Sequence, residues 1–203
     1  MRWWPRRQSV PNGGSSRKHP GHVTSTGSNS RVFWTAAVAI IISDVITKAL
    51  AVRYLLPAHI PHQVIGSVVR FTLAFNPGAA FSMSLGDNSR YIFGAFAVIA
   101  LYILWRLYRT SEVGDMTRVL ALGLAWGGAA GNLIDRLRSP RGVVDFIDIG
   151  FGDVRFWTFN VADSAVTIGA ITLAFVLWRE DREALARDAA EAAARDEMSS
   201  QAQ

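Results

Sequence analysis

The sequence predicts a mainly α-helical fold: a polytopic membrane protein with four transmembrane helices and a small β-rich extracytoplasmic platform. Half of its 203 residues are hydrophobic and only 18% are charged, so the mean hydropathy, +0.21, is high for a soluble protein. The apolar residues are concentrated in four stretches, at 32–52, 91–108, 119–134 and 161–178. Because a spanning helix needs about 20 mostly apolar residues, we expect spans at about 32–53, 91–109, 118–137 and 160–178. A soluble protein with long buried helices is the alternative, but helices that are apolar on every side suit lipid better.

The two ends of the chain differ in composition from these stretches. Residues 1–31 are rich in Ser, Gly, Pro and basic side chains and contain no apolar run. This composition predicts a disordered, basic cytoplasmic arm rather than a cleaved signal peptide. Residues 179–203 are Ala-rich and carry charges of both signs, which predicts a marginal helix in a cytoplasmic tail. The membrane domain is therefore expected to cover residues 32–178.

The long connection at 54–90 contains VIGSVVRFTLAF, whose β-branched and aromatic residues are typical of strands. We expect these strands to form the platform, and Gly86-Asp87-Asn88-Ser89 to form a turn before the second span. The connection at 137–158 contains one Pro and three Gly residues, so it is expected to be largely irregular. Its segment around Asp145 is expected to be a short strand or helix at the membrane surface.

Basic residues indicate the orientation in the membrane. They are frequent in the N-terminal arm, around the second connection (Arg106, Arg109 and Arg118) and after the last span. The positive-inside tendency then places both termini and the second connection in the cytoplasm. Four arginines near the third connection weaken this count and need another explanation: Arg136, Arg138, Arg141 and Arg155. No basic helix or aromatic-basic surface is recognisable, so no nucleic-acid partner is expected.

The chain has no cysteine, which excludes disulfides and thiol chemistry. Its four histidines lie in the polar arm and in the loop near Pro57 and Pro61, where exposed side chains are the ordinary interpretation: His19, His22, His59 and His62. We therefore expect no metal site and no cofactor.

Polar residues within the first and third spans lie near the outer end of each span. Asp44 and Lys48 are four residues apart on one helical face, in the order that favours an ion pair. In GGAAGNLIDR, Gly127 and Gly131 suit close helix contact, and three polar residues follow: Asn132, Asp135 and Arg136. The alternatives are structural: an Asp44–Lys48 salt bridge that locks helix packing, and an Asp135–Arg136 pair at the interface.

The fourth span runs inward and has its polar residues, Asn160 and Asp163, at its start. All three sets therefore converge at one leaflet. Ionisable groups in a membrane usually face the protein interior and have a function, although a helix cap would also explain this Asn and Asp. Asp145 is surrounded by apolar residues in RGVVDFIDIG, and desolvation raises the affinity of such a carboxylate for a proton. Asp145 and Asp163 together could share one proton and activate a water molecule.

Five ordered motifs resemble those of the lipoprotein signal peptidases, also called signal peptidase II, which are membrane aspartic proteases of bacteria. The motifs are SDVITK (43–48), FNPGAAFS (75–82), GGAAGNLIDR (127–136), VVDF (143–146) and FNVAD (159–163). The resemblance covers about residues 33–178. It implies that the protein removes the signal peptide of a prolipoprotein, cleaving before a cysteine that carries diacylglycerol. It also implies that Asp145 and Asp163 are the catalytic aspartates.

Within this resemblance, nine further residues are expected to bind substrate or support the site: Asn76, Gly78, Asn132, Asp135, Arg136, Asn160, Ala162, Asp44 and Lys48. Asn76 is placed to contact the substrate backbone, with Gly78, Ala79 and Ala80 permitting close approach, although a simple turn would also explain them. Asp44 and Lys48 are expected to support the bundle.

The expected partners are the prolipoprotein and membrane lipid, and we expect a monomer. The expected location is the bacterial cytoplasmic (inner) membrane, with the active site near the outer leaflet. An ion- or proton-translocating protein is the first alternative, and a scaffold that binds lipoprotein precursors without cleaving them is the second.

Overall fold

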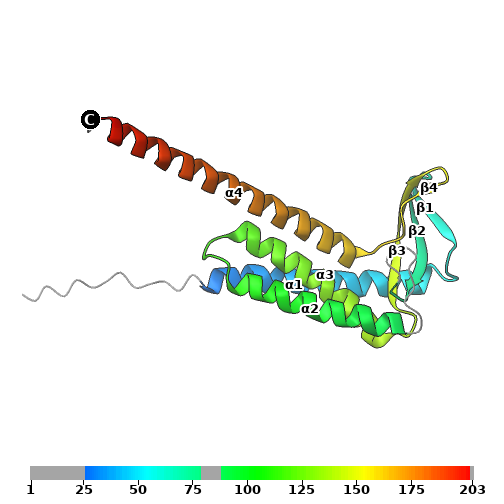
Figure 1. Ribbon diagram of the computed structural model, residues 1–203. Coiled ribbons are helices and arrows are strands. Elements are labelled where there is room, and N and C mark those ends of the chain that lie inside the picture. The colour runs from blue at the N-terminus through cyan, green and yellow to red at the C-terminus, as the bar shows by residue number, and fades with distance from the viewer. Residues whose placement is uncertain (1–25, 79–87, 202–203) are drawn as a thin grey trace, which may run out of the picture.

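The computed structural model describes residues 26–78 and 88–201, which form four helices and four strands (Figure 1). The helices are α1 (Thr26–Tyr54), α2 (Ser89–Arg109), α3 (Met116–Arg138) and α4 (Val161–Gln201). The strands are β1 (Pro61–Ile65), β2 (Val69–Asn76), β3 (Val143–Phe151) and β4 (Val154–Arg155). The mainly helical class with a small antiparallel sheet, predicted from the sequence, is therefore confirmed.

Helix α3 is the central element of the bundle, because it packs against α1, α2 and α4. Glycines make this packing close. A Cβ at Gly127 would lie 2.7 Å from the Ala37 carbonyl oxygen of α1, and one at Gly123 would lie 2.8 Å from that of Phe33. On the other side, a Cβ at Gly169 of α4 would lie 2.6 Å from the Ala121 carbonyl oxygen of α3. Side chains at these positions would force the helices apart.

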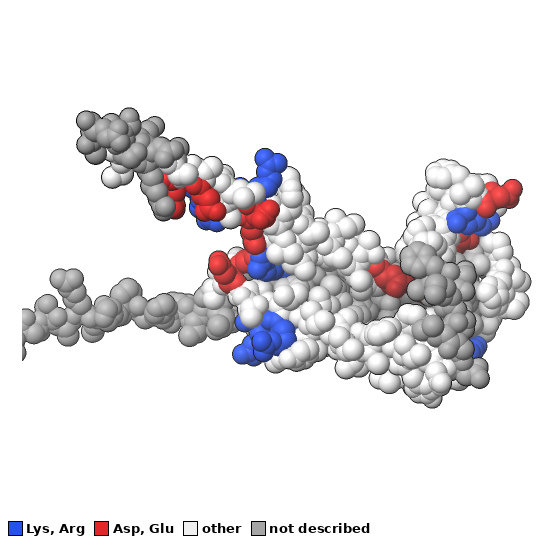
Figure 2. Space-filling view, in the orientation of Figure 1, with Lys and Arg blue, Asp and Glu red and all other residues white. Residues whose placement is uncertain are grey.

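Within residues 26–78 and 88–201, three helices are long and apolar enough to cross a membrane: Gly27–Tyr54, Ser89–Arg109 and Val161–Ala192. Their outer surfaces carry exposed apolar side chains such as Ile46, Phe96 and Ile168. On the face shown in Figure 2, charged side chains gather toward the two ends of the molecule and the middle of the bundle is uncharged. The chain therefore has the surface of a membrane protein. Glycine and alanine form most of the buried face of helix α3.

The four strands form one antiparallel sheet in the order β1-β2-β3-β4. It lies at one end of the bundle, opposite the end from which α4 projects (Figure 1). Leu73, Val144 and Phe146 of the sheet pack with Ala51 of α1, so the last turns of α1 support the sheet. In the register, Ala74 pairs with Asp145 and Asn76 pairs with Val143, which fixes Asp145 opposite β2.

The segment around Asp145 is a strand, one of the two expected alternatives, but the expectation that the third connection is largely irregular is wrong, because this strand runs continuously over nine residues, 143–151. The glycines that indicated irregularity lie at its margins: Gly142 precedes β3, and Gly150 and Gly152 belong to the hairpin with β4. The pairing partner of β3 is β2, about 70 residues earlier in the chain, and local composition carries no sign of it. Of the predicted turn, Gly86 and Asp87 lie outside the described residues, whereas Asn88 and Ser89 begin α2.

Two boundaries also differ from the expected ones. Helix α1 begins at Thr26, six residues before Val32. Asn29 explains this extension, because its amide donates to the Glu112 carbonyl oxygen (2.9 Å) and accepts from the Gly114 N–H (3.2 Å). Tertiary contact thus overrides the weak helix propensity of Gly, Ser and Asn. At the other end, α4 passes residue 178 without a break, and Arg118 of α3 pairs with its Glu180. Residues 1–25 lie outside the described part of the chain.

Candidate active site

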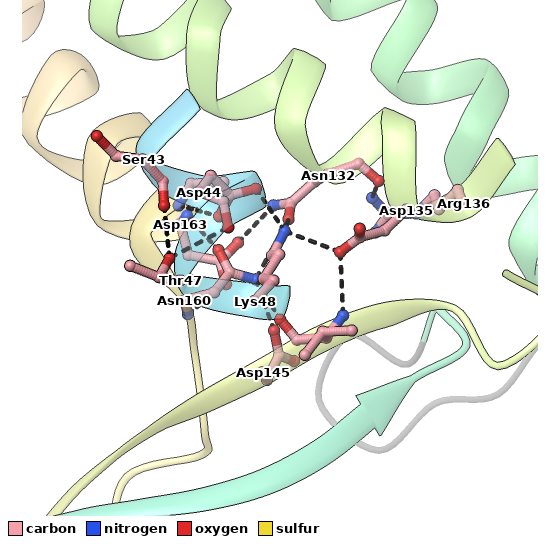
Figure 3. Close-up of polar contacts among 12 residues, drawn as sticks. Ser43, Asp44, Thr47, Lys48, Asn132, Asp135, Arg136, Asp145, Asn160 and Asp163 are labelled. Atoms are coloured by element: carbon pink, nitrogen blue, oxygen red, sulfur yellow. Dashed lines mark hydrogen bonds and ion pairs between the residues drawn. The ribbon is translucent and has the colours of Figure 1, made fainter. Parts of the chain in front are cut away.

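Polar side chains from three helices and one strand meet where the bundle joins the sheet (Figure 3). Helix α1 contributes Asp44 and Lys48, α3 contributes Asn132, Asp135 and Arg136, and the start of α4 contributes Asn160, Ala162 and Asp163. Strand β3 contributes Asp145. The structure therefore brings together ten of the eleven predicted residues in one hydrogen-bonded cluster, and Gly78 lines the adjoining cavity together with Asn76.

The start of α4 is a capping box. The Asp163 N–H donates to Asn160 Oδ1 (2.9 Å), and the Asn160 N–H donates to Asp163 Oδ2 (3.2 Å). Asn160 also uses the other half of its amide: Nδ2 donates to Asp145 Oδ1 (2.7 Å) and to the Val144 carbonyl oxygen (3.2 Å). The capping interpretation is thus right, and the same residue also links the two candidate catalytic aspartates.

Both aspartates are held from more than one side. Asp163 Oδ1 accepts from Asn132 Nδ2 (2.7 Å) while its Oδ2 takes part in the capping box. Asp145 is 3% exposed and is hydrogen-bonded by the side chains of Asn160 and Asn76. The two carboxyl groups face one cavity of about 940 Å³. Two carboxyl groups on a shared cavity are arranged for acid–base chemistry on a single bound water molecule.

Burial raises the pKa of Asp145 from its ordinary value to about 7, and the negative charge of Asp163 adds to this effect. Hydrogen bonds from Asn160 and Asn76 and the charge of Lys48 oppose the rise in pKa. Near neutral pH the Asp145 carboxyl is therefore partly protonated.

The Asp44–Lys48 pair is buried behind these aspartates, with Nζ 2.7 Å from Asp44 Oδ2. Lys48 Nζ also lies 2.9 Å from Asp135 Oδ2 and 2.9 Å from Asn132 Oδ1. The alternative of an Asp135–Arg136 pair is therefore wrong, because Asp135 pairs with Lys48. Adjacent helical residues project in different directions, and Arg136 instead donates to the Asn132 carbonyl oxygen (3.0 Å). Among the described residues, no group of three His, Cys, Asp or Glu side chains is placed to hold a metal ion.

The cavity has one polar end and apolar walls. Asn132, Arg136, Asp145 and Asp163 form the polar end. The walls come from Phe93 of α2, from Val166 and Ile168 of α4, and from Phe156 and Trp157 before α4. Such a cavity suits a peptide bond that is attached to apolar groups. The two aromatics could have been found from the sequence, because only Thr158 separates them from FNVAD, but no pattern singles out Phe93 among the apolar residues of α2.

Asn76 and Gly78 form the edge of the cavity at the end of β2. Asn76 Oδ1 accepts from the Gly78 N–H (3.0 Å), so these residues form a turn as well as lining the cavity. Gly78 has φ +114°, and a Cβ there would lie 2.5 Å from Phe93 Cδ2. Only glycine fits this position. Ala79 and Ala80 lie outside the described residues.

Three of the four arginines near the third connection, Arg136, Arg141 and Arg155, contact groups within the protein. Arg155 pairs with Asp148 (2.7 Å) and donates to the Ser67 carbonyl oxygen (2.7 Å). Asp148 also accepts from Arg70 and Thr72 of β2. Arg141 lies over the Phe75 ring at 4.1 Å from its centroid. These contacts hold β3 against β2 and β4. The register between β2 and β3, which sets the position of Asp145, therefore depends on them.

Comparisons with known proteins identify the family to which the chain belongs. The family model described as "Signal peptidase (SPase) II" matches residues 36–179. A lipoprotein signal peptidase of Mycolicibacterium smegmatis is 44% identical over 148 residues, which are 70% of this chain and 59% of that protein. One from Coxiella burnetii is 43% identical over 141 residues, which are 68% of this chain and 83% of that protein.

The fold is also similar to that of a solved bacterial membrane enzyme. The TM-score is 0.65 at 29% sequence identity, with 76% of this chain and 90% of the other chain covered. The family resemblance found in the five motifs is thereby confirmed over residues 36–179. The chain belongs to the signal peptidase II family, whose named relatives here are lipoprotein signal peptidases.

Proposed function

We propose that this protein is an aspartic endopeptidase that cleaves diacylglyceryl-modified prolipoproteins immediately before the lipidated cysteine, with Asp145 and Asp163 as its catalytic pair. Membership of the family makes the chain a protease that removes lipoprotein signal peptides. The observation that carries the catalytic assignment is that these two carboxyl groups, joined through Asn160, face one cavity with apolar walls.

In the proposed reaction, a water molecule lies between the two carboxyl groups and the scissile carbonyl carbon. The ionised carboxylate removes a proton from the water, the oxygen bonds to the carbonyl carbon, and the protonated carboxyl donates its proton to the carbonyl oxygen. As the C–N bond of the tetrahedral intermediate breaks, the carboxyl that took the water proton gives it to the leaving amine. The other carboxylate accepts a proton from a hydroxyl of the intermediate, so the new carboxyl group forms and the pair again carries one proton. The raised pKa of Asp145, about 7, supports a pair that carries one proton near neutral pH.

The neighbouring residues have distinct proposed roles. Asn132 and Asn160 hold the carboxyl groups in position by hydrogen bonds of 2.7 Å each. Arg136 lines the polar end of the cavity, where its charge would stabilise negative charge on the carbonyl oxygen. Asn76 would contact the substrate backbone, and Gly78 leaves room for it.

The proposed arrangement has four spanning helices, with α3 as the fourth, in the bacterial cytoplasmic (inner) membrane. Both termini would be cytoplasmic, because Arg106 and Arg109 end α2 and Arg118 begins α3. The sheet and the site would then lie at the outer leaflet, the depth at which a lipid-anchored scissile bond is found. The proposed state is a monomer surrounded by lipid, whose exposed apolar side chains on the helices would contact the acyl chains.

The test uses purified protein in detergent and a fluorescent prolipoprotein, with and without its diacylglyceryl group. We expect cleavage of the lipidated substrate, with the lipidated cysteine as the new N-terminal residue by mass spectrometry, and no cleavage by Asp163→Asn. Cleavage at another peptide bond, or equal cleavage without the lipid, would contradict the proposed specificity. A proton or ion flux in proteoliposomes without proteolysis would instead support the translocating alternative.

A further inference from the structure

Lys48 occupies the centre of the polar cluster and is 3% exposed (Figure 3). Its ammonium group contacts one oxygen from each of three side chains: Asp44 Oδ2 (2.7 Å), Asp135 Oδ2 (2.9 Å) and Asn132 Oδ1 (2.9 Å). An ammonium has three N–H groups and no acceptor, so three oxygens match its bonding capacity. A simple salt bridge within α1 would need only Asp44. The other two partners, Asp135 and Asn132, also contact the catalytic pair or the backbone next to it.

The contact with Asn132 determines which way its amide faces. Asn132 Oδ1 accepts hydrogen bonds from Lys48 Nζ (2.9 Å) and Asn160 Nδ2 (3.2 Å). Asn132 Nδ2 donates to Asp163 Oδ1 (2.7 Å). If the amide were reversed, its NH₂ group would face the Lys48 ammonium and its oxygen would face the Asp163 carboxylate. Both contacts would be repulsive, so the charge of Lys48 holds Asn132 in the orientation that donates to Asp163.

The contact with Asp135 leads to the other aspartate. Asp135 Oδ2, which pairs with Lys48, also accepts from the Val144 N–H (3.1 Å), and Val144 directly precedes Asp145. On the opposite side, Asp44 Oδ1 accepts from the Ala162 N–H (3.0 Å), and Ala162 directly precedes Asp163. One turn of α1 is thus connected to the backbone beside both catalytic aspartates. Asp44 contacts the residue before Asp163 directly, and Lys48 reaches the residue before Asp145 through Asp135.

We propose that Lys48 is a positioning residue for catalysis, which sets the geometry of Asp163 through Asn132 and that of Asp145 through Asp135. The inference rests on the proposed function of the two aspartates and goes beyond a role in holding the helices together. It predicts that loss of Lys48 affects the chemical step more than substrate binding, because no Lys48 atom lines the cavity. It also predicts a change in pH dependence, which a residue that only packs the helices would not produce.

The direction of that change follows from the charges facing Asp145. Asp163 of α4 is negative, Arg136 of α3 and Lys48 of α1 are positive, and Asn76 of β2 is neutral. Removing the positive charge of Lys48 favours the protonated form of Asp145 and raises its pKa. The high-pH limb of the rate profile, where the pair loses its proton, should therefore move to higher pH.

The experiment compares Lys48→Met with Thr47→Val in detergent, measuring kcat, KM and the pH profile on the lipidated substrate. Thr47 lies on the same turn, and its hydroxyl contacts only carbonyl oxygens of its own helix, at Ser43 and Asp44. We expect kcat of Lys48→Met to fall about 100-fold, KM to stay within about 3-fold, and the high-pH limb to rise, whereas Thr47→Val resembles wild type. If Lys48→Met does not fold, Asp44→Asn/Lys48→Met removes the opposite charges together, and the same kcat and KM pattern is expected.

A folded variant with wild-type kcat, or one whose loss lies mainly in KM with an unmoved pH limb, would overturn the positioning role. Asp145→Asn is measured alongside to separate the two proposals. If Asp145→Asn is inactive and the Lys48 variant is normal, only the role of Lys48 is wrong. If Asp145→Asn cleaves normally, the catalytic pair itself is wrong.

Discussion

The Asn160 side chain makes different contacts through the two ends of its amide. Its oxygen caps α4 and its nitrogen holds Asp145. Asn followed three residues later by an acid is a recognisable start of a helix, so the capping contact could be predicted from FNVAD. The contact with Asp145 could not, because it depends on the packing of β3 against the start of α4. The identity of the site residues is thus readable from motifs, whereas their partners need the tertiary structure.

The raised pKa of Asp145 leads to a prediction about activity. With a pKa of about 7, Asp145 loses its proton as the pH rises through neutrality, and the pair no longer has a proton to donate to the carbonyl oxygen. We expect kcat to fall above about pH 7, approaching tenfold for each further pH unit. The measurement is the pH profile of kcat at saturating lipidated substrate. A constant kcat up to pH 9 would show that no such proton is needed.

The same pKa has a consequence for stability that needs no substrate. Its folded value lies above the ordinary 3.8, so this carboxyl contributes stability that is present at low pH and lost as the pH rises through about 7. Asp145→Asn has no charge to bury. The Tm of Asp145→Asn relative to wild type should therefore rise between pH 5 and pH 8 in detergent. A difference in Tm that does not change with pH would contradict burial of an ionising Asp145.

At the scale of elements, the contact between α1 and α3 determines how Asp44 is held. A Cβ at Gly131 would lie 2.6 Å from Asp44 Oδ2 and 3.2 Å from Asp44 Cγ. The GGAAG pattern indicated a close helix contact, and the structure shows that this contact includes a carboxylate of the polar cluster. The small residues of α3 are therefore required by the site as well as by the helix packing.

Gly131→Ala is expected to displace Asp44, lower the Tm by about 5 °C and strongly reduce cleavage, because overpacking of this kind typically costs about 1–3 kcal/mol. Gly94→Ala in α2 is the matched control. A Cβ at Gly94 would have its nearest neighbour, Leu133 Cδ1, at 4.0 Å, and alanine is the better helix former. Thermal unfolding and activity in detergent check both variants. If the two variants had the same Tm and the same activity, the close contact between Gly131 and Asp44 would not be needed for the site.

The strands show where sequence patterns stop being informative. The β-branched segment at 64–75 predicted strands from its composition, whereas the segment around Asp145 predicted only a short strand or helix, and the nearby glycines concealed the full length of β3. Strand pairing is a long-range interaction, and Arg70, Thr72 and Arg155 become partners of Asp148 only when β2, β3 and β4 are adjacent. The apolar pattern of a helix is local, so most of the helix boundaries could be predicted to within a few residues.

At the scale of the whole molecule, the proposed orientation in the membrane can be tested by chemical labelling. The chain has no cysteine, so single substitutions can be labelled without interference. Val113→Cys tests the exposed α2–α3 connection, and Asp153→Cys tests the exposed β3–β4 turn. We expect a membrane-impermeant maleimide to label Asp153→Cys in intact spheroplasts and Val113→Cys only after permeabilisation. Labelling of both from one side would exclude α3 as a spanning helix.

The account depends most on Asp145 and Asp163 acting as one catalytic pair. The most direct measurement is the rate of cleavage of a diacylated prolipoprotein by purified Asp145→Asn and Asp163→Asn, with Asp153→Asn as the control. Asp153 carries the same charge in an exposed turn. We predict that each of the first two variants folds but loses activity at least about 1,000-fold, and that Asp153→Asn stays near the wild-type rate. Near-normal cleavage by either of the first two, or complete loss in Asp153→Asn, would contradict the account.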